Sequence, residues 1–190
     1  MNVPTVGVFA LQGDFREHHR MLRRLGVDTT TVRTPEQLAD VDGLVIPGGE
    51  STTIGKLAHR FGLVDPLKER ISEGLPVFGT CAGLIFLATD VNGSDQHVLG
   101  ALDVVVERNA FGRQNESFEA VLDVKGLDEP YDAVFIRAPW IDKVGSGVDV
   151  LAEIDDHVVM VGQGNILATA FHPELTADQR VHILFVDMIT

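Results

Sequence analysis

Short apolar runs alternate with helix-like stretches through the first half of the chain. The run 43–46 is apolar throughout and is typical of a buried strand, whereas 15–25 reads as a helix that ends at Gly26. This pattern predicts strands at 5–11, 27–32, 43–46 and 75–78, and helices at 15–25, 35–39, 52–60, 66–73 and 84–88. Regular alternation of this kind favours a parallel sheet with helices on both faces.

The second half of the chain is dominated by strand-like runs. Asp155-Asp156 separates two of them and predicts a tight hairpin turn. The expected strands cover 102–107, 118–124, 133–136, 148–154, 157–161 and 166–171, and a helix is expected at 178–189. We find no linker, repeat or low-complexity stretch. The sequence therefore predicts one α/β domain over 1–190, with three layers, a mostly parallel central sheet and a partly antiparallel C-terminal addition.

The composition narrows the class of protein. The chain has 190 residues, 45% of them hydrophobic, which is enough for a sizeable core. The net charge of -13 argues against nucleic acid and anionic membrane surfaces as partners. We find no membrane-spanning run and no signal peptide, and a single cysteine forms no intrachain disulfide, so we expect a cytoplasmic protein. The histidines show no metal-ligand spacing, so no metal is expected.

That single cysteine, Cys81, lies in a Gly-x-Cys-x-Gly turn between an expected strand and an expected helix. This is the form of the nucleophile elbow, in which flanking glycines allow a tight backbone conformation. The start of a helix beside the sulfur would favour a thiolate. A lone cysteine is more often a small buried apolar residue, but the two glycines and the strand–helix context favour a nucleophile.

A nucleophilic cysteine needs a base and a group that orients the base. His172-Pro173-Glu174 offers both near the end of the chain. In an extended segment, residues two apart project to the same side, so we expect Glu174 to hold the His172 imidazole. Taken alone, this segment is more often a solvated strand end. With Cys81 it predicts a Cys–His–Glu hydrolase triad.

A glycine-rich turn, Pro47-Gly48-Gly49, follows the expected strand 43–46. Its backbone could approach a reacting carbonyl and donate an N–H to the developing oxyanion, with the N–H of Ala82 as a second donor. The simpler interpretation is a turn in which Ser51 or Thr52 caps the following helix. Both can hold. In a parallel sheet, this turn, Cys81 and the Gln12-Gly13 segment would line one crevice at the carboxyl ends of strands.

These motifs resemble those of the class I, triad-type glutamine amidotransferases. More specifically, the chain is similar over nearly its whole length to the glutaminase subunits of pyridoxal 5'-phosphate synthases. The blocks that carry the similarity are 10–13 (ALQG), 47–53 (PGGESTT), 79–84 (GTCAGL), 107–114 (ERNAFGRQ), 135–139 (FIRAP) and 171–176 (FHPELT). Many amidotransferases share the elbow and the His-x-Glu pair, whereas 108–114 and 135–139 are far more specific.

The resemblance implies hydrolysis of L-glutamine to glutamate and ammonia, with no cofactor. Cys81 would attack the amide, His172 would shuttle protons and Glu174 would orient His172. The N–H groups of Gly49 and Ala82 would hold the oxyanion. The family's substrate-binding positions correspond to Gly49, Glu50, Ser51, Arg108, Ile136 and Arg137. A guanidinium suits the α-carboxylate of glutamine and Glu50 could accept from its α-amino group, although a surface salt bridge is the commoner role for an arginine.

The resemblance also implies a partner: a (β/α)8-barrel synthase subunit that receives the ammonia and without which the glutaminase is weak or silent. Two alternatives stay open. One is a different cysteine hydrolase, or an amidotransferase subunit of another pathway, on the same scaffold. The other is a docking subunit without catalysis, which the presence of Cys81, His172 and Glu174 argues against.

Overall fold

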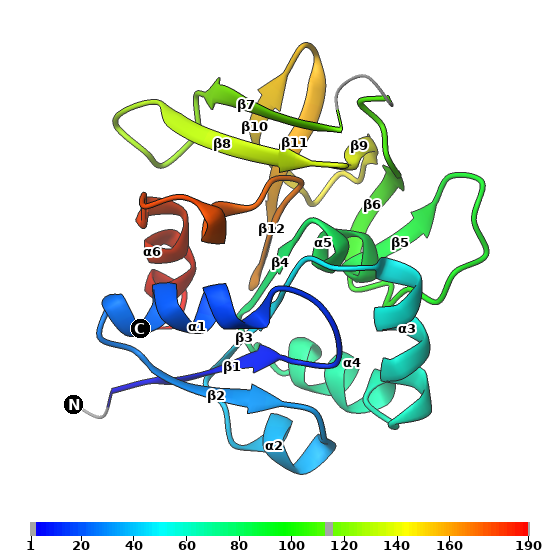
Figure 1. The fold of residues 1–190 in the computed structure, drawn as a ribbon. Coiled ribbons are helices and arrows are strands. Elements are labelled where there is room, and N and C mark those ends of the chain that lie inside the picture. Colours follow the sequence, from blue (N-terminus) through cyan, green and yellow to red (C-terminus); the bar gives the residue numbers. More distant parts are fainter. Residues whose placement is uncertain (1–2, 113–115, 190) are drawn as a thin grey trace.

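The computed structural model describes residues 3–112 and 116–189 (Figure 1). Within these residues, ten strands form one sheet and two more form a separate hairpin. The order across the sheet is β2 (Asp28–Val32), β1 (Thr5–Phe9), β3 (Gly43–Ile46), β4 (Val77–Thr80), β12 (Ile166–Thr169), β11 (His157–Gln163), β9 (Trp140–Val144), β6 (Leu102–Glu107) and β5 (Ala88–Val91), while β10 (Asp149–Ile154) pairs with β11. The hairpin consists of β7 (Ser117–Leu122) and β8 (Tyr131–Ile136).

Parallel pairing is concentrated in the part of the sheet that the first half of the chain builds. The neighbours β2, β1, β3, β4 and β12 are all parallel, whereas β11 is antiparallel to β12, β9 and β10. The expected parallel sheet with an antiparallel addition is therefore confirmed. The register pairs Thr80 of β4 with Thr169 of β12, so these two strands end at the same level.

Helices cover both faces of the sheet. They are α1 (Phe15–Arg24), α2 (Pro35–Ala39), α3 (Ser51–Arg60), α4 (Val64–Ser72), α5 (Ala82–Leu87) and α6 (Arg180–Asp187). The Phe78 ring meets Phe185 of α6, with centroids 5.6 Å apart, whereas a Cβ on Gly79 would point at Leu87 of α5. Successive residues of a strand face opposite sides, so α5 and α6 pack on opposite faces of β4.

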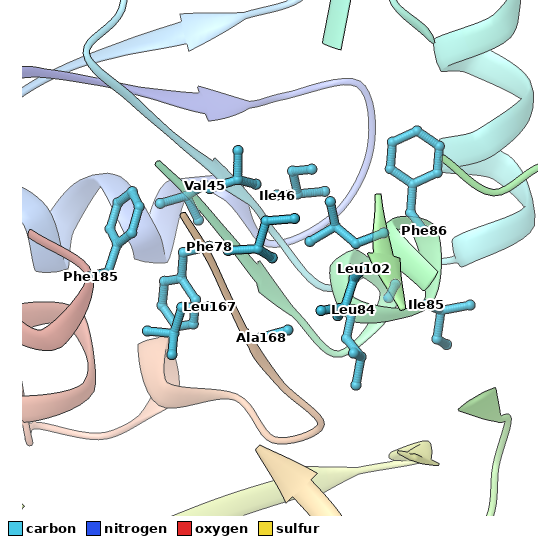
Figure 2. Close-up of a cluster of buried hydrophobic side chains, with 14 of the residues drawn as sticks. Val45, Ile46, Phe78, Leu84, Ile85, Phe86, Leu102, Leu167, Ala168 and Phe185 are labelled. Atoms are coloured by element: carbon cyan, nitrogen blue, oxygen red, sulfur yellow. The ribbon is translucent and has the colours of Figure 1, made fainter. Parts of the chain in front are cut away.

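The core lies between these layers. Figure 2 shows Val45, Phe78 and Leu167 of three neighbouring strands together, with Phe185 nearby. All four residues of β3 are buried, as are all four of β4, which explains why β3 reads as a continuous apolar run. β4 lies two residues beyond the strand expected at 75–78 and ends in Gly79 and Thr80. Every residue of α5 is buried too. The segments on either side of Cys81 are therefore firmly packed.

Several details differ from the expected elements. The strands β5 and β9 were not expected, and β1 ends at Phe9, so Ala10 and Leu11 begin a loop. The hairpin turn at Asp155-Asp156 is confirmed, since both residues have positive φ, 48° and 63°. Arg113 and Gln114, the end of one block that carries the resemblance, lie outside the described residues.

Candidate active site

Four neighbouring parallel strands deliver the candidate residues to one edge of the sheet. β1 leads to Gln12, β3 to the Gly48-Gly49 turn and β4 to Cys81. β12 ends at Thr169 and leads to His172. The expected crevice at the carboxyl ends of the strands is therefore present, and it includes the distant His172 because β12 inserts beside β4.

Cys81 occupies a strained turn at the end of β4. Its backbone has a φ of 50° and a ψ of -104°, and α5 begins at the next residue. The Cys81 N–H donates to the Thr169 carbonyl at 2.8 Å, which fixes the turn against β12. A Cβ on Gly83 would lie 2.0 Å from the Ile46 carbonyl oxygen, so the turn demands glycine there. The geometry of a nucleophile elbow, predicted from the glycine spacing, is present.

His172 and Glu174 form a short side-chain contact in the site. His172 Nδ1 lies 2.6 Å from Glu174 Oε1, and both side chains are buried. The predicted contact is present, but the expected extended segment is wrong. Glu174 lies in a short 3-10 helix, Pro173–Leu175, whose first residue is the proline. This turn brings the Glu174 carboxylate into contact with the His172 imidazole. The backbone N–H of His172 donates to the Val134 carbonyl at 2.8 Å, which anchors the histidine to β8.

The surroundings of His172 favour its cationic form. Burial alone would lower the pKa of His172, but its hydrogen bonds to Cys81 and Glu174, together with their negative charges, outweigh burial and raise the pKa to about 10. An imidazolium held between the Cys81 sulfur and a carboxylate suits a base that takes a proton from the thiol.

The Gly48-Gly49 turn is fixed by the loop that follows β1. The Gly48 carbonyl accepts from the Asp14 N–H at 3.0 Å, and the Glu50 N–H donates to Gln12 Oε1 at 2.8 Å. Gly49 has a φ of 154°, and a Cβ there would lie 2.3 Å from Gln12 Oε1. Because the carbonyl and N–H of one peptide point in opposite directions, the Gly49 N–H points away from the Asp14 loop. An oxyanion role for Gly49 and Ala82 stays a prediction.

The carboxylate of Glu50 has a structural task that the sequence analysis did not foresee. It accepts from the backbone N–H groups of Thr52 and Thr53 at 3.1 and 2.8 Å and also from both hydroxyls. Glu50 therefore caps α3, where Ser51 or Thr52 was expected to do so. Burial raises the pKa of Glu50, but these bonds outweigh it and lower the pKa to about 2. Little acceptor capacity is left for an α-amino group.

Arg108 follows β6 and belongs to a polar chain with two other residues. Its Nη1 donates to Gln96 Oε1 at 2.9 Å, and Gln96 Nε2 donates to Ser51 Oγ at 3.1 Å. Two expected substrate-binding residues are thus linked through Gln96, which the sequence analysis missed. Gln96 lies in a loop without periodicity, so no sequence pattern marks it.

Ile136 and Arg137 lie at the end of β8. Arg137 has a φ of 43°, which is uncommon for a residue with a side chain, and its N–H donates to the Glu116 carbonyl at 2.5 Å. The Ala110 N–H donates to the Ala138 carbonyl at 3.1 Å, so the loops that carry Arg108 and Arg137 are joined. The two arginine blocks, far apart in the sequence, therefore form one wall of the site.

A cavity of about 440 Å³ connects these groups. Its size is within the usual range for a small-molecule site. Every residue predicted for the site except Glu174, which lies beneath His172, lines it. The lining includes Gly49, Glu50, Ser51, Cys81, Ala82, Arg108, Ile136, Arg137 and His172, together with Gln12, Gly13, Asp14, Ile85 and Asn109.

The described residues also bring three potential metal ligands together: Asp14, His172 and Glu174 offer atoms within 4.8 Å of one another. His172 Nδ1 is already engaged with Glu174, so an ion there would break the bond that orients the imidazole. Among the described helices, none combines the length and the apolar composition that a membrane span requires.

The chain has extensive similarity to known proteins. The SNO glutamine amidotransferase family matches residues 8–190. Pyridoxal 5'-phosphate synthase subunit PdxT of Streptomyces avermitilis is 59% identical over 192 residues, which cover 100% of this chain and 96% of the relative. The protein of the same name from Carboxydothermus hydrogenoformans is 56% identical over 185 residues, which cover 97% of each.

Solved structures give the same picture. A crystal structure described as a glutamine amidotransferase superposes with a TM-score of 0.93 at 53% identity, and the match covers 97% of this chain and 98% of the other. A chain from the structure of PurLQS from Thermotoga maritima superposes with a TM-score of 0.74 at 16% identity, covering 100% of each chain, and supports the fold alone.

Proposed function

The chain belongs to the SNO glutamine amidotransferase family, and on that premise we propose that it is the glutaminase subunit of a pyridoxal 5'-phosphate synthase and uses Cys81, His172 and Glu174 as its triad. The observation that carries the proposal is the hydrogen bond of 2.6 Å between His172 and Glu174, with Cys81 and His172 facing the same cavity.

The first half of the reaction forms a thioester. The Cys81 sulfur attacks the side-chain amide carbon of glutamine, and the carbonyl π electrons move to oxygen. The N–H groups of Gly49 and Ala82 stabilise that oxyanion. As the oxyanion collapses, the carbon–nitrogen bond breaks, and His172 gives its proton to the leaving nitrogen, which departs as ammonia.

The second half of the reaction releases glutamate. Neutral His172 takes a proton from water, and the resulting hydroxide attacks the thioester carbon. The carbon–sulfur bond then breaks and regenerates the thiolate opposite the imidazolium. Glu174 keeps one face of the imidazole fixed throughout, so the same nitrogen serves both proton transfers.

Two arginines give the cavity its preference for a free amino acid. Arg108 and Arg137 line the same cavity as Cys81 and His172, and a guanidinium binds the α-carboxylate of glutamine well. The link from Arg108 through Gln96 to Ser51 fixes that guanidinium in place. A peptide, which has no free α-carboxylate at an internal glutamine, would lose this contact.

The name of the relatives, subunit of pyridoxal 5'-phosphate synthase, supports a partner for this chain. We propose that ammonia passes from Cys81 to a (β/α)8-barrel synthase subunit that binds this chain. An amidotransferase subunit of another pathway would be expected to match relatives with other names over its full length. A docking subunit without catalysis would not need the ordered His172–Glu174 pair.

The test is glutamate release from L-glutamine by the purified chain, alone and mixed with the synthase subunit of the same organism. We expect release that the synthase stimulates and that Cys81→Ala abolishes. Glutaminase activity that is indifferent to the synthase would assign the chain to another pathway. No release in either mixture would favour the docking subunit.

A further inference from the structure

A second histidine lies behind the triad, on the face of Glu174 away from the substrate cavity. His18 is part of α1, the helix that follows the Gln12–Asp14 loop, and its side chain is fully buried. Its partner His182, on α6, is also fully buried. A fully buried pair of imidazoles is unusual, and the reaction described above does not use it.

The contacts of His18 connect α6 to the triad. His18 Nδ1 lies 3.0 Å from His182 Nε2. On the other side of the ring, His18 Nε2 lies 3.2 Å from Thr80 Oγ1 and 3.5 Å from Glu174 Oε2. Glu174 Oε1 is already engaged with His172, whereas Oε2 is buried and has no hydrogen-bond partner among the described residues. His18 Nε2 is thus the donor within reach of the free oxygen of the orienting carboxylate.

Both imidazoles are neutral. Burial, and then the charges that His182 and His172 would carry, lower the pKa of His18 well below its ordinary value, and burial lowers the pKa of His182 to about 3. A neutral imidazole has one N–H, so each ring donates once and accepts once. The contacts decide which nitrogen carries that proton.

One arrangement gives the N–H of each ring an acceptor. If His182 carries its proton on Nε2, it donates to His18 Nδ1, and the proton of His18 is then on Nε2, facing Glu174 and Thr80. In the opposite arrangement a bare His18 Nε2 would face a carboxylate. His182 Nδ1 would then hold a buried N–H without an acceptor, because that nitrogen has no partner among the described residues.

We propose that His18 is a positioning residue for the glutaminase reaction: its Nε2–H is directed at Glu174 Oε2 and holds the carboxylate so that Oε1 faces His172. The contacts run from His182 through His18 and Glu174 to His172. They connect α6 and α1, which lie close together in Figure 1, to the active site. The inference rests on the proposed function.

A neutral donor has a particular advantage at this place. A lysine or arginine beside Glu174 would cancel the negative charge that stabilises the His172 cation, whereas neutral His18 orients the carboxylate and leaves that charge in place. The 3.5 Å contact is long for a hydrogen bond, and we expect it to shorten when substrate binds, as catalytic contacts often do.

A matched pair of variants isolates the link to Glu174. In His18→Gln the amide nitrogen takes roughly the place of Nε2 and still donates to Glu174. In His18→Asn the amide reaches only the place of Nδ1, so the contact with His182 is kept and the one with Glu174 is lost. In the complex with the synthase, kcat for glutamate release should fall about 10-fold in His18→Asn, with KM unchanged, and stay close to wild type in His18→Gln.

Equal kcat in the two folded variants, with matched melting temperatures, would overturn the proposal, as would a change confined to KM. His172→Asn distinguishes a failure of the His18 proposal from a failure of the proposed triad. If it is inactive while His18→Asn keeps full kcat, only the role of His18 is wrong. If it is as active as wild type, the triad itself is wrong.

A measurement on the wild-type chain tests the same proposal without any variant. Two-dimensional ¹H–¹⁵N spectra of ¹⁵N-histidine-labelled protein report which ring nitrogen carries the proton. We expect the proton on Nε2 in both His18 and His182. A proton on Nδ1 of His18, with Nε2 bare, would remove the donor to Glu174 and refute the proposal.

Discussion

Replacing Glu174 by glutamine removes one negative charge from the active site and, with the amide oxygen toward His172, places the amide nitrogen where Oε2 now faces His18. Glutamine has nearly the same shape as glutamate, and its amide oxygen can still accept from His172 Nδ1, now 2.6 Å from Glu174 Oε1. The His172 imidazole would therefore stay in place. What changes is the stability of its cationic form, on which the proposed mechanism depends.

The size of the effect follows from the pKa of His172. That pKa is about 10, against an ordinary value of 6.5, and Cys81 and Glu174 both contribute to the rise. A difference of about 3.5 in pKa corresponds to about 5 kcal/mol in favour of the cation. If Glu174 supplies about half, Glu174→Gln loses about 2 to 3 kcal/mol, and kcat/KM should fall roughly 30- to 150-fold.

The assay is steady-state glutamate release by the complex with the synthase, with the rate of Cys81 alkylation by iodoacetamide as a second readout. Both rates should fall in Glu174→Gln at neutral pH. Glu153→Gln, an exposed change in β10, serves as the control and should alter neither. Unchanged kcat/KM and unchanged alkylation in Glu174→Gln would refute the view that this carboxylate stabilises the His172 cation.

Three further outcomes are expected. Gly83→Ala should lower the free energy of unfolding by about 3 kcal/mol in urea titrations, because its Cβ would lie 2.0 Å from the Ile46 carbonyl, whereas Gly147→Ala, with nothing within 4 Å, should change it little. Arg108→Gln should raise KM for glutamine about 10-fold and leave kcat near wild type, because a charged contact to the α-carboxylate is lost; a loss confined to kcat would contradict that role. Acid should destabilise the fold, because the folded-state pKa values of His18 and His182 lie below 6.5 and the unfolded chain therefore binds more protons. The free energy of unfolding should fall by about 1.4 kcal/mol per pH unit per histidine below about pH 6.5. For His182 this fall should continue down to about pH 3. His182→Gln should have a shallower slope in this range, and an identical slope would show that His182 is not the group responsible.

The parallel half of the fold could be predicted because its signals are local. The strand β3 is buried on both faces and therefore stands out as an apolar run, an apolar run leads into β4, and the glycines around Cys81 mark the turn that links β4 to α5. The strands β5 and β9 could not be predicted in the same way. β5 follows α5 without a break and is half exposed, and β9 is short and mixed in character, so neither has a clear period.

The residues of the proposed triad could be singled out for similar reasons, but their contacts could not be predicted. The carboxylate of Glu174 reaches His172 through a 3-10 turn rather than along a strand, and the Glu50 carboxylate caps a helix. Gln96 and His18 act through tertiary neighbours far away in the sequence. One weak signal was available for His18: it lies on the same side of α1 as the buried Met21 and Leu22, where a histidine must find polar partners.

The most direct test of the central claim is covalent labelling with a glutamine analogue whose side-chain amide is replaced by a diazoketone. If Cys81 is the nucleophile of a glutamine site, mass spectrometry should find a single adduct on the peptide that contains Cys81. Excess L-glutamine should suppress that adduct, and Cys81→Ala should abolish it. An adduct on another residue, or one that glutamine does not suppress, would contradict the claim.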